Sequence, residues 1–414
     1  ADSVAQMSIE VRPLTVELAP AFRSAISSTF GYDADLEDPG AAAHFEALFE
    51  LDRMFPVFDG NEVVATGGDF GFQMAVPGEQ QLSTSGLTIV TVRPTHTRQG
   101  ALTMMMREHF ARARERGEPL SALWASEFPI YGRFGYGPSG SLKEIRIDAR
   151  QAGRGGREEG VTVRLVDVDE AKKLLPGIYA AIQPTRPGMY IRSGAWWEHR
   201  HFRDPEKHRG GASALRFAVA EAKGEPVGYV FYRQKASWDQ LTEGEIHIRE
   251  MMPVTDAAYR ALWHFIVGID LFPIVKYWNN PVDDPLEFLF HDGRAIRTKA
   301  SDALWTRLVD VPAALRARRY SGDGAVTIHV ADSFCDWNDG SYRIEVDDGA
   351  ATCERVTSAP EVVMPASTLG ALYMGGRNAR ALARVGLLEG DAGAIGKLDT
   401  LFRSYPAPWC PEIF

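Results

Sequence analysis

The chain has 414 residues, and its 45 basic and 55 acidic side chains give it a formal net charge of −10. At roughly 150 residues per domain, this length predicts two or three domains. Hydrophobic residues make up 45% of the chain and charged residues 24%, which excludes disorder along most of its length. The acidic balance disfavours a general nucleic-acid binder and would suit a cationic substrate.

Two features concern the cellular compartment. The three cysteines, Cys335, Cys353 and Cys410, are too few for a disulfide framework, and none has metal-ligand spacing. The most apolar run, Ala261–Trp278, is interrupted by ionisable side chains and therefore predicts no membrane span. The first residues lack a charged region followed by an apolar core, so we expect no secretory signal and a cytoplasmic protein.

The first third of the chain predicts alternating strands and helices. The expected strands are residues 8–14, 55–58, 63–70, 87–92 and 120–125. The expected helices are residues 18–30, 41–51 and 100–116, and a polar, Asp-rich loop at 33–39 lies between the first two. The Asp59-Gly60-Asn61 turn is typical of a tight hairpin. Residues 87–125 therefore read as a β-α-β unit.

The same order of elements begins again after a glycine-rich and charged linker at residues 150–160. The expected strands are residues 161–165, 217–221, 227–233 and 245–251, and the expected helices are residues 169–181 and 255–269. This pattern indicates a weak internal repeat. The strand-to-helix junction differs between the copies, because Arg98-Gln99-Gly100-Ala101 contains a glycine and Pro253-Val254-Thr255-Asp256 contains none.

The composition changes near residue 316. The expected elements are strands at residues 327–330 and 342–346 and helices at residues 366–374 and 379–386. The chain closes with three prolines interleaved with Trp409, Ile413 and Phe414. Chain ends are usually polar and frayed, so this composition indicates either a docked functional segment or a hydrophobic tail that only packs.

The segment from Val90 to Thr103 is the first candidate site. A strand that ends at Val92 leads through Arg98 and Gly100 into an amphipathic helix. A helix N-terminus offers unpaired N–H groups and partial positive charge, glycine permits close backbone approach, and arginine adds a charged donor. The alternative is a simple helix start. The GxxxxGK[ST] and GxGxxG patterns of nucleotide-binding loops are absent from this segment.

The second candidate site is the glycine-laced segment 125–137, which follows the next strand. Ligands bind at the carboxyl ends of strands in split α/β sheets. Tyr131 and Tyr136 are protonated at neutral pH and can donate protons, although packing aromatics would give the same pattern.

Three segments carry a resemblance to a known family: TVRPTHTRQG at 91–100, LWASE at 123–127 and IYGRFGYG at 130–137. They resemble the Eis (enhanced intracellular survival) family of acetyl-CoA-dependent N-acetyltransferases in the GNAT superfamily. The resemblance covers the whole chain and implies an α/β and α+β fold of tandem GNAT domains, the second degenerate, followed by a domain like sterol carrier proteins. The implied bounds are residues 1–149, 150–310 and 311–414.

The resemblance also implies roles for individual residues. It makes Tyr131 the general acid that protonates the coenzyme A thiolate, and the free carboxylate of Phe414 the general base. Val90 and Val92 match the strand that pairs with the pantetheine arm. The positions implied for acetyl-CoA are Val90, Thr91, Val92, Arg98, Gln99, Gly100, Ala101, Leu102, Thr103, Ser126 and Glu127. No metal is required.

This chain departs from the superfamily pattern [QR]xxGx[GA] at its first position, Thr97, and at its last, Leu102. Tyr32 and Ile89 stand where relatives can carry an acid and an aromatic. The resemblance implies polycationic amine acceptors such as aminoglycosides and a homo-hexamer. Two alternatives stay open: acetylation of lysines in proteins or peptides, and a non-catalytic acyl-CoA or lipid sensor that uses the third domain.

Other patterns favour ordinary structural roles. His199, His201 and His208 lack zinc-site spacing, and residues 104–106, a run of three methionines, predict core packing. Trp196-Trp197 could belong to a core or line a substrate cleft between the first two domains.

Overall fold

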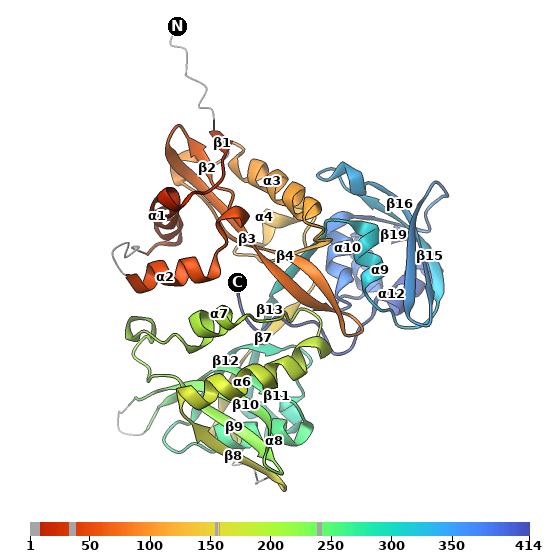
Figure 1. Cartoon of the computed structure of the whole chain (residues 1–414). Coiled ribbons are helices and arrows are strands. Elements are labelled where there is room, and N and C mark those ends of the chain that lie inside the picture. The colour runs from red at the N-terminus through yellow and green to blue at the C-terminus, as the bar shows by residue number, and fades with distance from the viewer. Residues whose placement is uncertain (1–8, 33–38, 154–155, 157, 238–241) are drawn as a thin grey trace.

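The structure is a computed structural model that describes residues 9–32, 39–153, 156, 158–237 and 242–414. The first eight residues, most of the Asp-rich loop and part of the predicted linker lie outside these ranges. The described chain forms three lobes, each built on one sheet (Figure 1).

The first lobe holds a seven-stranded sheet in the order β1-β2-β3-β4-β5-β14-β6. Its strands are β1 (Ile9–Val11), β2 (Val57–Asp59), β3 (Glu62–Val76), β4 (Gln80–Val92), β5 (Leu120–Trp124), β6 (Gly137–Pro138) and β14 (Leu304–Leu308). Its helices are α1 (Ala19–Phe30), α2 (Pro39–Leu48), α3 (Ala101–Glu115) and the single turn α4 (Phe128–Tyr131).

The second lobe repeats this arrangement in a sheet with the order β13-β7-β12-β11-β10-β9-β8. Its strands are β7 (Ser141–Asp148), β8 (Val161–Val166), β9 (Arg216–Ala222), β10 (Glu225–Lys235), β11 (Glu245–Pro253), β12 (Ile274–Pro281) and β13 (Ile296–Asp302). Its helices include α5 (Ala149–Ala152), α6 (Val168–Ile182), α7 (Gly194–Trp196) and α8 (Asp256–Val267). The weak repeat seen in the sequence is therefore a structural repeat.

The third lobe is a five-stranded sheet, β17-β16-β15-β18-β19, with helices packed against it. Its strands are β15 (Gly324–Ala331), β16 (Gly340–Asp347), β17 (Ala350–Val356), β18 (Val362–Pro365) and β19 (Glu389–Gly390). Its helices are α9 (Val311–Ala317), α10 (Ala366–Tyr373), α11 (Ala379–Arg384) and α12 (Ala392–Phe402).

The first two lobes exchange strands. Strand β7 follows β6 of the first lobe directly, yet it pairs with β12 and β13 of the second sheet. Strand β14 follows β13 and returns to the first sheet, where it lies between β5 and β6. No single cut in the chain separates the two sheets.

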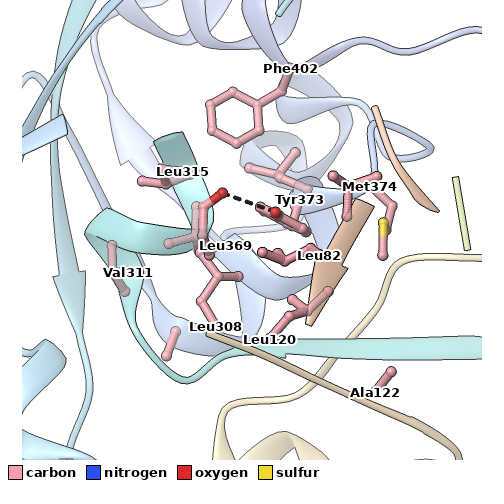
Figure 2. Packing of buried hydrophobic residues seen from close by; sticks show 14 of the residues in the cluster. Leu82, Leu120, Ala122, Leu308, Val311, Leu315, Leu369, Tyr373, Met374 and Phe402 are labelled. Carbon is pink, nitrogen blue, oxygen red and sulfur yellow. Dashed lines mark hydrogen bonds between the residues drawn. The ribbon is translucent and has the colours of Figure 1, made fainter. Parts of the chain in front are cut away.

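A continuous apolar core joins the first and third lobes (Figure 2). Leu82 and Leu120 of the first sheet share one buried cluster with Leu315 of α9 and Phe402 of α12. The Tyr373 hydroxyl, buried in this cluster, donates to a carbonyl of α9 at 2.9 Å, which satisfies its one donor. Such a core fixes the third lobe against the first.

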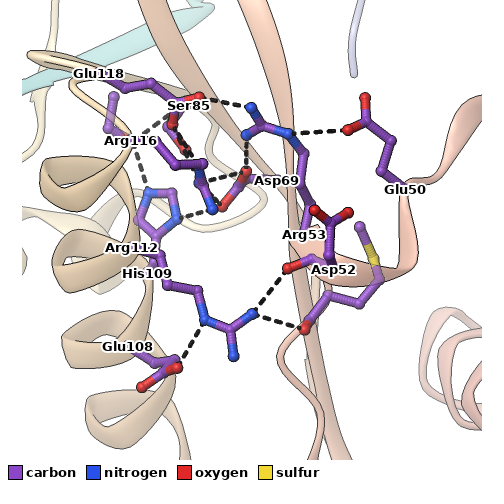
Figure 3. A network of polar contacts seen from close by, with 12 residues as sticks. Glu50, Asp52, Arg53, Asp69, Ser85, Glu108, His109, Arg112, Arg116 and Glu118 are labelled. Carbon is purple, nitrogen blue, oxygen red and sulfur yellow. Dashed lines mark hydrogen bonds and ion pairs between the residues drawn. The ribbon is translucent and has the colours of Figure 1, made fainter. Parts of the chain in front are cut away.

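A buried polar network lies beneath the first sheet (Figure 3). Asp69 accepts hydrogen bonds from Arg53 at 2.6 Å and from Arg116 at 2.9 Å, and His109 contacts it at 3.2 Å. Burial would raise the pKa of Asp69, but His109, Arg116 and Arg53 outweigh it and lower that pKa. The ionised carboxylate therefore ties β3 to α3.

Most predicted elements are present, with two kinds of difference. The predicted strands at 63–70 and 87–92 are the ends of one longer hairpin, β3–β4. The sequence patterns did not predict several strands and helices, including β7, β12, β14 and α12. In the described ranges, no helix is long and apolar enough to cross a membrane.

Candidate active site

The central feature is a split in the first sheet between β4 and β5. The two strands pair in parallel only from Thr84 opposite Leu120 to Gly86 opposite Ala122. Beyond this point β4 runs on to Val92 and β5 to Trp124 without pairing to each other. The far half of β4 therefore presents an unpaired edge to the gap, which can bind an extended ligand through backbone hydrogen bonds.

A β-bulge shapes this edge of β4. The β3–β4 register shifts between Thr66 and Gly68, and Ile89 has a φ of +47°. The Thr66 hydroxyl donates to the Ile89 carbonyl at 2.7 Å and lies 2.6 Å from the Thr91 hydroxyl. The Thr91 side chain therefore faces β3. Of the positions implied for acetyl-CoA, Val90 and Val92 are the half-buried ones on this strand.

The loop after β4 is built to receive an anion. Arg98 and Gly100 both adopt left-handed backbone, with φ of +62° and +91°. Helix α3 starts directly after Gly100, which provides no side-chain cap. Its first recorded backbone bond runs from Met104 to the Gly100 carbonyl, so the N–H groups of the first turn stay available.

The side chains of this loop are mostly in solvent. Arg98, Gln99 and Thr103 are exposed, Leu102 is half-buried, and Ala101 is buried against the sheet. Within the described residues Arg98 makes no recorded ion pair. An exposed, unpaired arginine beside free N–H groups suits a diphosphate.

Helix α4 holds the candidate acid at the carboxyl end of β5. Tyr131 is 6% exposed, and its ring packs edge-on against Tyr136 at 6.0 Å between centroids. Burial, followed by the charge of Glu127, raises the pKa of Tyr131 to about 12. Tyr131 is therefore protonated at neutral pH. Ser126 and Glu127 are exposed at the start of this turn.

Tyr136 has a different environment from Tyr131. Its hydroxyl lies 2.6 Å from the Ser121 hydroxyl and 3.2 Å from the His109 ring, so it belongs to the buried polar network. The structure thus gives different surroundings to the two tyrosines, which the residue pattern left equivalent and of which the family resemblance singled out Tyr131.

The C-terminal tail crosses from the third lobe over the second to the first, and it ends where the lobes meet (Figure 1). The Asn279 side chain donates to the Cys410 carbonyl at 2.9 Å and accepts from the Trp409 indole at 3.0 Å. Arg192 donates to Glu412 at 2.7 Å and to Glu250 at 3.0 Å. Burial would raise the pKa of Glu412, but Arg192 and His201 hold it well below its ordinary range.

These contacts place Phe414 beside the split between β4 and β5. Its ring packs edge-on against Phe72 at 5.0 Å and against Tyr190 at 5.8 Å. A Cβ on Gly86, the last β4 residue paired with β5, would lie 3.2 Å from the Phe414 ring. The chain terminus and the start of the split are therefore neighbours.

The comparisons with known proteins agree with this geometry. Residues 10–139 and residues 188–316 each match an acetyltransferase (GNAT) domain family, and residues 311–411 match a sterol carrier protein domain. The chain is 34% identical to the N-acetyltransferase Eis of Mycobacterium tuberculosis over 89% of this chain and 91% of that one. The chain belongs to the Eis family of GNAT N-acetyltransferases.

Other relatives support the assignment. An uncharacterized N-acetyltransferase of Streptomyces avermitilis is 37% identical over 89% of this chain and 91% of its own. The crystal structure of Eis1 from Mycobacterium abscessus superposes with a TM-score of 0.84 at 29% identity, covering 98% of this chain and 100% of that one. GNAT domains use acetyl-CoA, so this Eis-family chain is an acetyltransferase.

The sequence patterns did not predict the tail clamp, which is the pair of ion pairs that joins Arg192 to Glu250 and to Glu412. Arg192 and Glu250 come from the second lobe and Glu412 from the third. Charged residues at separations of 58 and 220 positions show no recognisable spacing. Only the proline-rich tail hinted at docking.

The alternatives for Trp196-Trp197 are resolved by packing. Trp196 lies edge-on to Phe72 at the meeting of the lobes and donates to Glu412 at 2.9 Å. Trp197 belongs to the core of the second lobe, next to Tyr179. Trp196 therefore supports the tail.

Within the described residues, no group of three or more His, Cys, Asp or Glu side chains is placed so that it could hold a metal ion.

Proposed function

We propose that this protein transfers an acetyl group directly from acetyl-CoA to a primary amine, with Tyr131 as general acid and the Phe414 carboxylate as general base. The amine nitrogen attacks the thioester carbonyl, the C–S bond breaks and an amide forms. The nitrogen loses a proton to the Phe414 carboxylate, and the departing sulfur takes the hydroxyl proton of Tyr131. The observation that carries this proposal is that Tyr131 packs in one buried cluster with residues of β4 and β5, while the Phe414 ring lies beside Gly86, where the split begins.

The protonation state of Tyr131 supports its role as an acid. Because its pKa is about 12, the hydroxyl proton is present throughout the neutral range. A thiol, with a pKa of about 8.5, is a stronger acid than Tyr131, so Tyr131 donates this proton in concert with C–S bond cleavage rather than in a separate step.

The position of Phe414 supports its role as a base. An α-carboxyl in water has a pKa of about 3.3–3.7, which makes it a weak base toward an ammonium ion. Proximity offsets part of this weakness, because a fixed base reacts at a high effective concentration. Arg192 and Trp196 donate to the Glu412 side chain. Arg200 donates to the Ile413 carbonyl, so both residues that precede the terminus are held in place.

Acetyl-CoA, the acetyl donor, would bind along the split between β4 and β5 and at the loop that precedes α3. The unpaired β4 edge at Val90 and Val92 fits an extended amide-bearing arm, and the N–H groups after Gly100 together with Arg98 fit the diphosphate.

For the acceptor we propose polycationic amines such as aminoglycosides, on the resemblance to the Eis family and on the net charge of −10. A basic cluster borders the tail: Arg200 donates to the Ile413 carbonyl, and the rings of His44 and His199 lie 5.7 Å apart. Burial and neighbouring arginines lower the pKa of His44 to about 4, so His44 is neutral at pH 7 and adds no repulsion toward a cationic acceptor.

We also propose that the chain forms the homo-hexamer that the resemblance to the Eis family implies. Light scattering can measure this oligomeric state.

The test is an acetyl-CoA consumption screen over aminoglycosides, small polyamines and lysine peptides, run with the wild type and Tyr131→Phe. We expect an aminoglycoside to be acetylated and Tyr131→Phe to lower turnover about 10²- to 10⁴-fold, with the dissociation constant of acetyl-CoA unchanged. Tyr405→Phe, at a site 91% exposed, is the matched control. If only lysine peptides were acetylated, the acceptors would be peptide lysines and not aminoglycosides. If acetyl-CoA bound but no amine were acetylated, the protein would be a non-catalytic acyl-CoA sensor.

A further inference from the structure

A pocket of about 670 Å³ lies between α4 of the first lobe, β13 of the second and α10 of the third. Phe128 and Gly132 of α4 form one wall, Ala300 of β13 another, and Ala371 of α10 a third. The volume falls within the range of small-molecule sites, roughly 300–1,000 Å³. The position is distinct from the split between β4 and β5, since none of the residues implied for acetyl-CoA lines it.

The pocket is apolar at its mouth. Phe128 is 61% exposed and Leu387 is 46% exposed, although both are large hydrophobic side chains. Phe128 is held edge-on against Trp305 at 4.9 Å between ring centroids. Exposed apolar residues around a concave site favour an apolar ligand.

One cation in this pocket has donors to spare. The Arg377 guanidinium is held through Nε, which donates to the Pro138 carbonyl at 2.7 Å, and through Nη2, which donates to Ser141 Oγ at 2.8 Å. Among the described residues Nη1 makes no recorded hydrogen bond and Arg377 makes no recorded ion pair. A partly buried guanidinium without a carboxylate favours an anionic ligand group.

The other charged side chain that lines the pocket in the described structure is Asp302. Its Oδ2 accepts the Trp305 indole N–H at 2.7 Å. Asp302 therefore already accepts a hydrogen bond within the protein, whereas Nη1 of Arg377 donates none among the described residues. Asp302 lies close enough to Arg377 for their charges to interact. The negative charge of Asp302 therefore lowers the affinity of this pocket for an anion.

We propose that this pocket binds an apolar monocarboxylate, with the alkyl chain against Phe128 and Leu387 and the carboxylate on Arg377. An apolar chain covers the exposed rim, and a carboxylate accepts the unused Nη1 donors. The proposal is independent of the acetyl-transfer chemistry.

The experiment is calorimetric titration of the full chain with decanoate. We expect binding in the micromolar range, a loss of at least tenfold in Arg377→Gln, and a severalfold gain in Asp302→Asn. Decylamine should bind more weakly than decanoate, because it would bring a second cation to Arg377. Repeating the titration on Tyr131→Phe should give the same affinity, which separates this proposal from the proposed function.

A second variant covers misfolding of Arg377→Gln. Ala300→Trp fills the pocket from an exposed position on β13, one edge strand of the second sheet, and should abolish decanoate binding. Leu165→Trp, at an exposed site on the opposite edge strand β8, is the matched control and should bind decanoate normally. Equal affinity in wild type and Arg377→Gln, tighter binding of decylamine, no heat up to about 1 mM decanoate, or normal binding in Ala300→Trp would each overturn the proposal.

Discussion

The two GNAT lobes have the same split sheet and use it in opposite ways. In the second lobe β11 and β12 pair only as far as Ile248 and Tyr277, then separate like β4 and β5 in the first. Two residues beyond those points stand Glu250 and Asn279, and both are engaged with the tail, directly or through Arg192. The tail of the chain therefore contacts the second split, whereas the first split is where we propose that acetyl-CoA binds.

The helix that follows each split shows the same contrast. Helix α3 begins after Gly100, whose left-handed backbone leaves the first N–H groups uncapped. Helix α8 begins after Thr255, whose side chain accepts from the Ala258 N–H at 3.1 Å, and Asp256 adds an acid to its first turn. A capped and acidic N-terminus repels a diphosphate. The degenerate lobe has therefore become a support for the tail.

The largest effect should come from changing the end of the tail. A C-terminal amide on Phe414, made by ligation, removes the carboxylate charge with the ring in place. We expect turnover to fall about 10²- to 10⁴-fold with unchanged acetyl-CoA affinity, since general-base catalysis is lost. A Gly-Gly extension should have the same effect. An amidated protein with normal turnover would remove Phe414 from the mechanism.

The second-largest effect should come from removing Arg192, which holds the tail against the second lobe. Arg192→Leu leaves the carboxylates of Glu250 and Glu412 buried without their cation, and we expect a loss of about 3–5 kcal/mol in the free energy of unfolding. Chemical denaturation measures it. Lys299→Met, which breaks a surface ion pair with Glu144, is the control and should cost at most about 1 kcal/mol. A stable Arg192→Leu protein with normal turnover would contradict the role of the clamp.

A smaller effect compares the two helix starts directly. Gly100→Val forces a β-branched residue into left-handed backbone, although a Cβ there would meet open space. We expect acetyl-CoA affinity to fall about tenfold, since about 1–2 kcal/mol of strain would shift the loop. Thr255→Ala in the second lobe should cost about 1 kcal/mol of stability and leave acetyl-CoA affinity unchanged. Equal effects of the two variants on binding would end the distinction between the lobes.

The smallest expected effect is on the pH profile. Tyr131 must be protonated to act as an acid, and its raised pKa of about 12 keeps the proton bound as the pH rises. We therefore expect no loss of turnover from Tyr131 between pH 7 and 10 in steady-state assays. A basic limb near pH 9 that disappears in Tyr131→Phe would show that the tyrosine is less buried in the working enzyme.

Local patterns predicted the elements with strong periodicity. The start of α3 after Gly100 and the repeat of strands and helices in the second lobe follow from helical spacing, glycine and alternation. The β3–β4 hairpin was predicted too short because glycines interrupt both strands. At Gly71, just past the predicted strand 63–70, a Cβ would lie 2.4 Å from Nη2 of Arg53. At Gly86, just before the predicted strand 87–92, a Cβ would lie 2.4 Å from the Phe72 ring. These glycines make room for packed side chains, which local patterns do not contain.

Some relationships lie beyond any local pattern. Strand β7 pairs with β12, about 130 positions away, and β14 returns to the first sheet, where it joins β5 to β6. Side-chain alternation reveals a strand, but it does not reveal which sheet supplies the partner, because every sheet edge offers the same backbone donors and acceptors.

By itself, the sequence determined the soluble-type composition, the repeated strand-helix order, the glycine junction and, through its motifs, the resemblance to the Eis family. Only the tertiary structure decided which tyrosine is buried beside the split and which joins the polar network. It also decided that Arg192 links Glu250 to Glu412 and so brings the chain terminus to Gly86. The physical reason is that helices and strands form from contacts a few residues apart, whereas this site forms from contacts hundreds of residues apart.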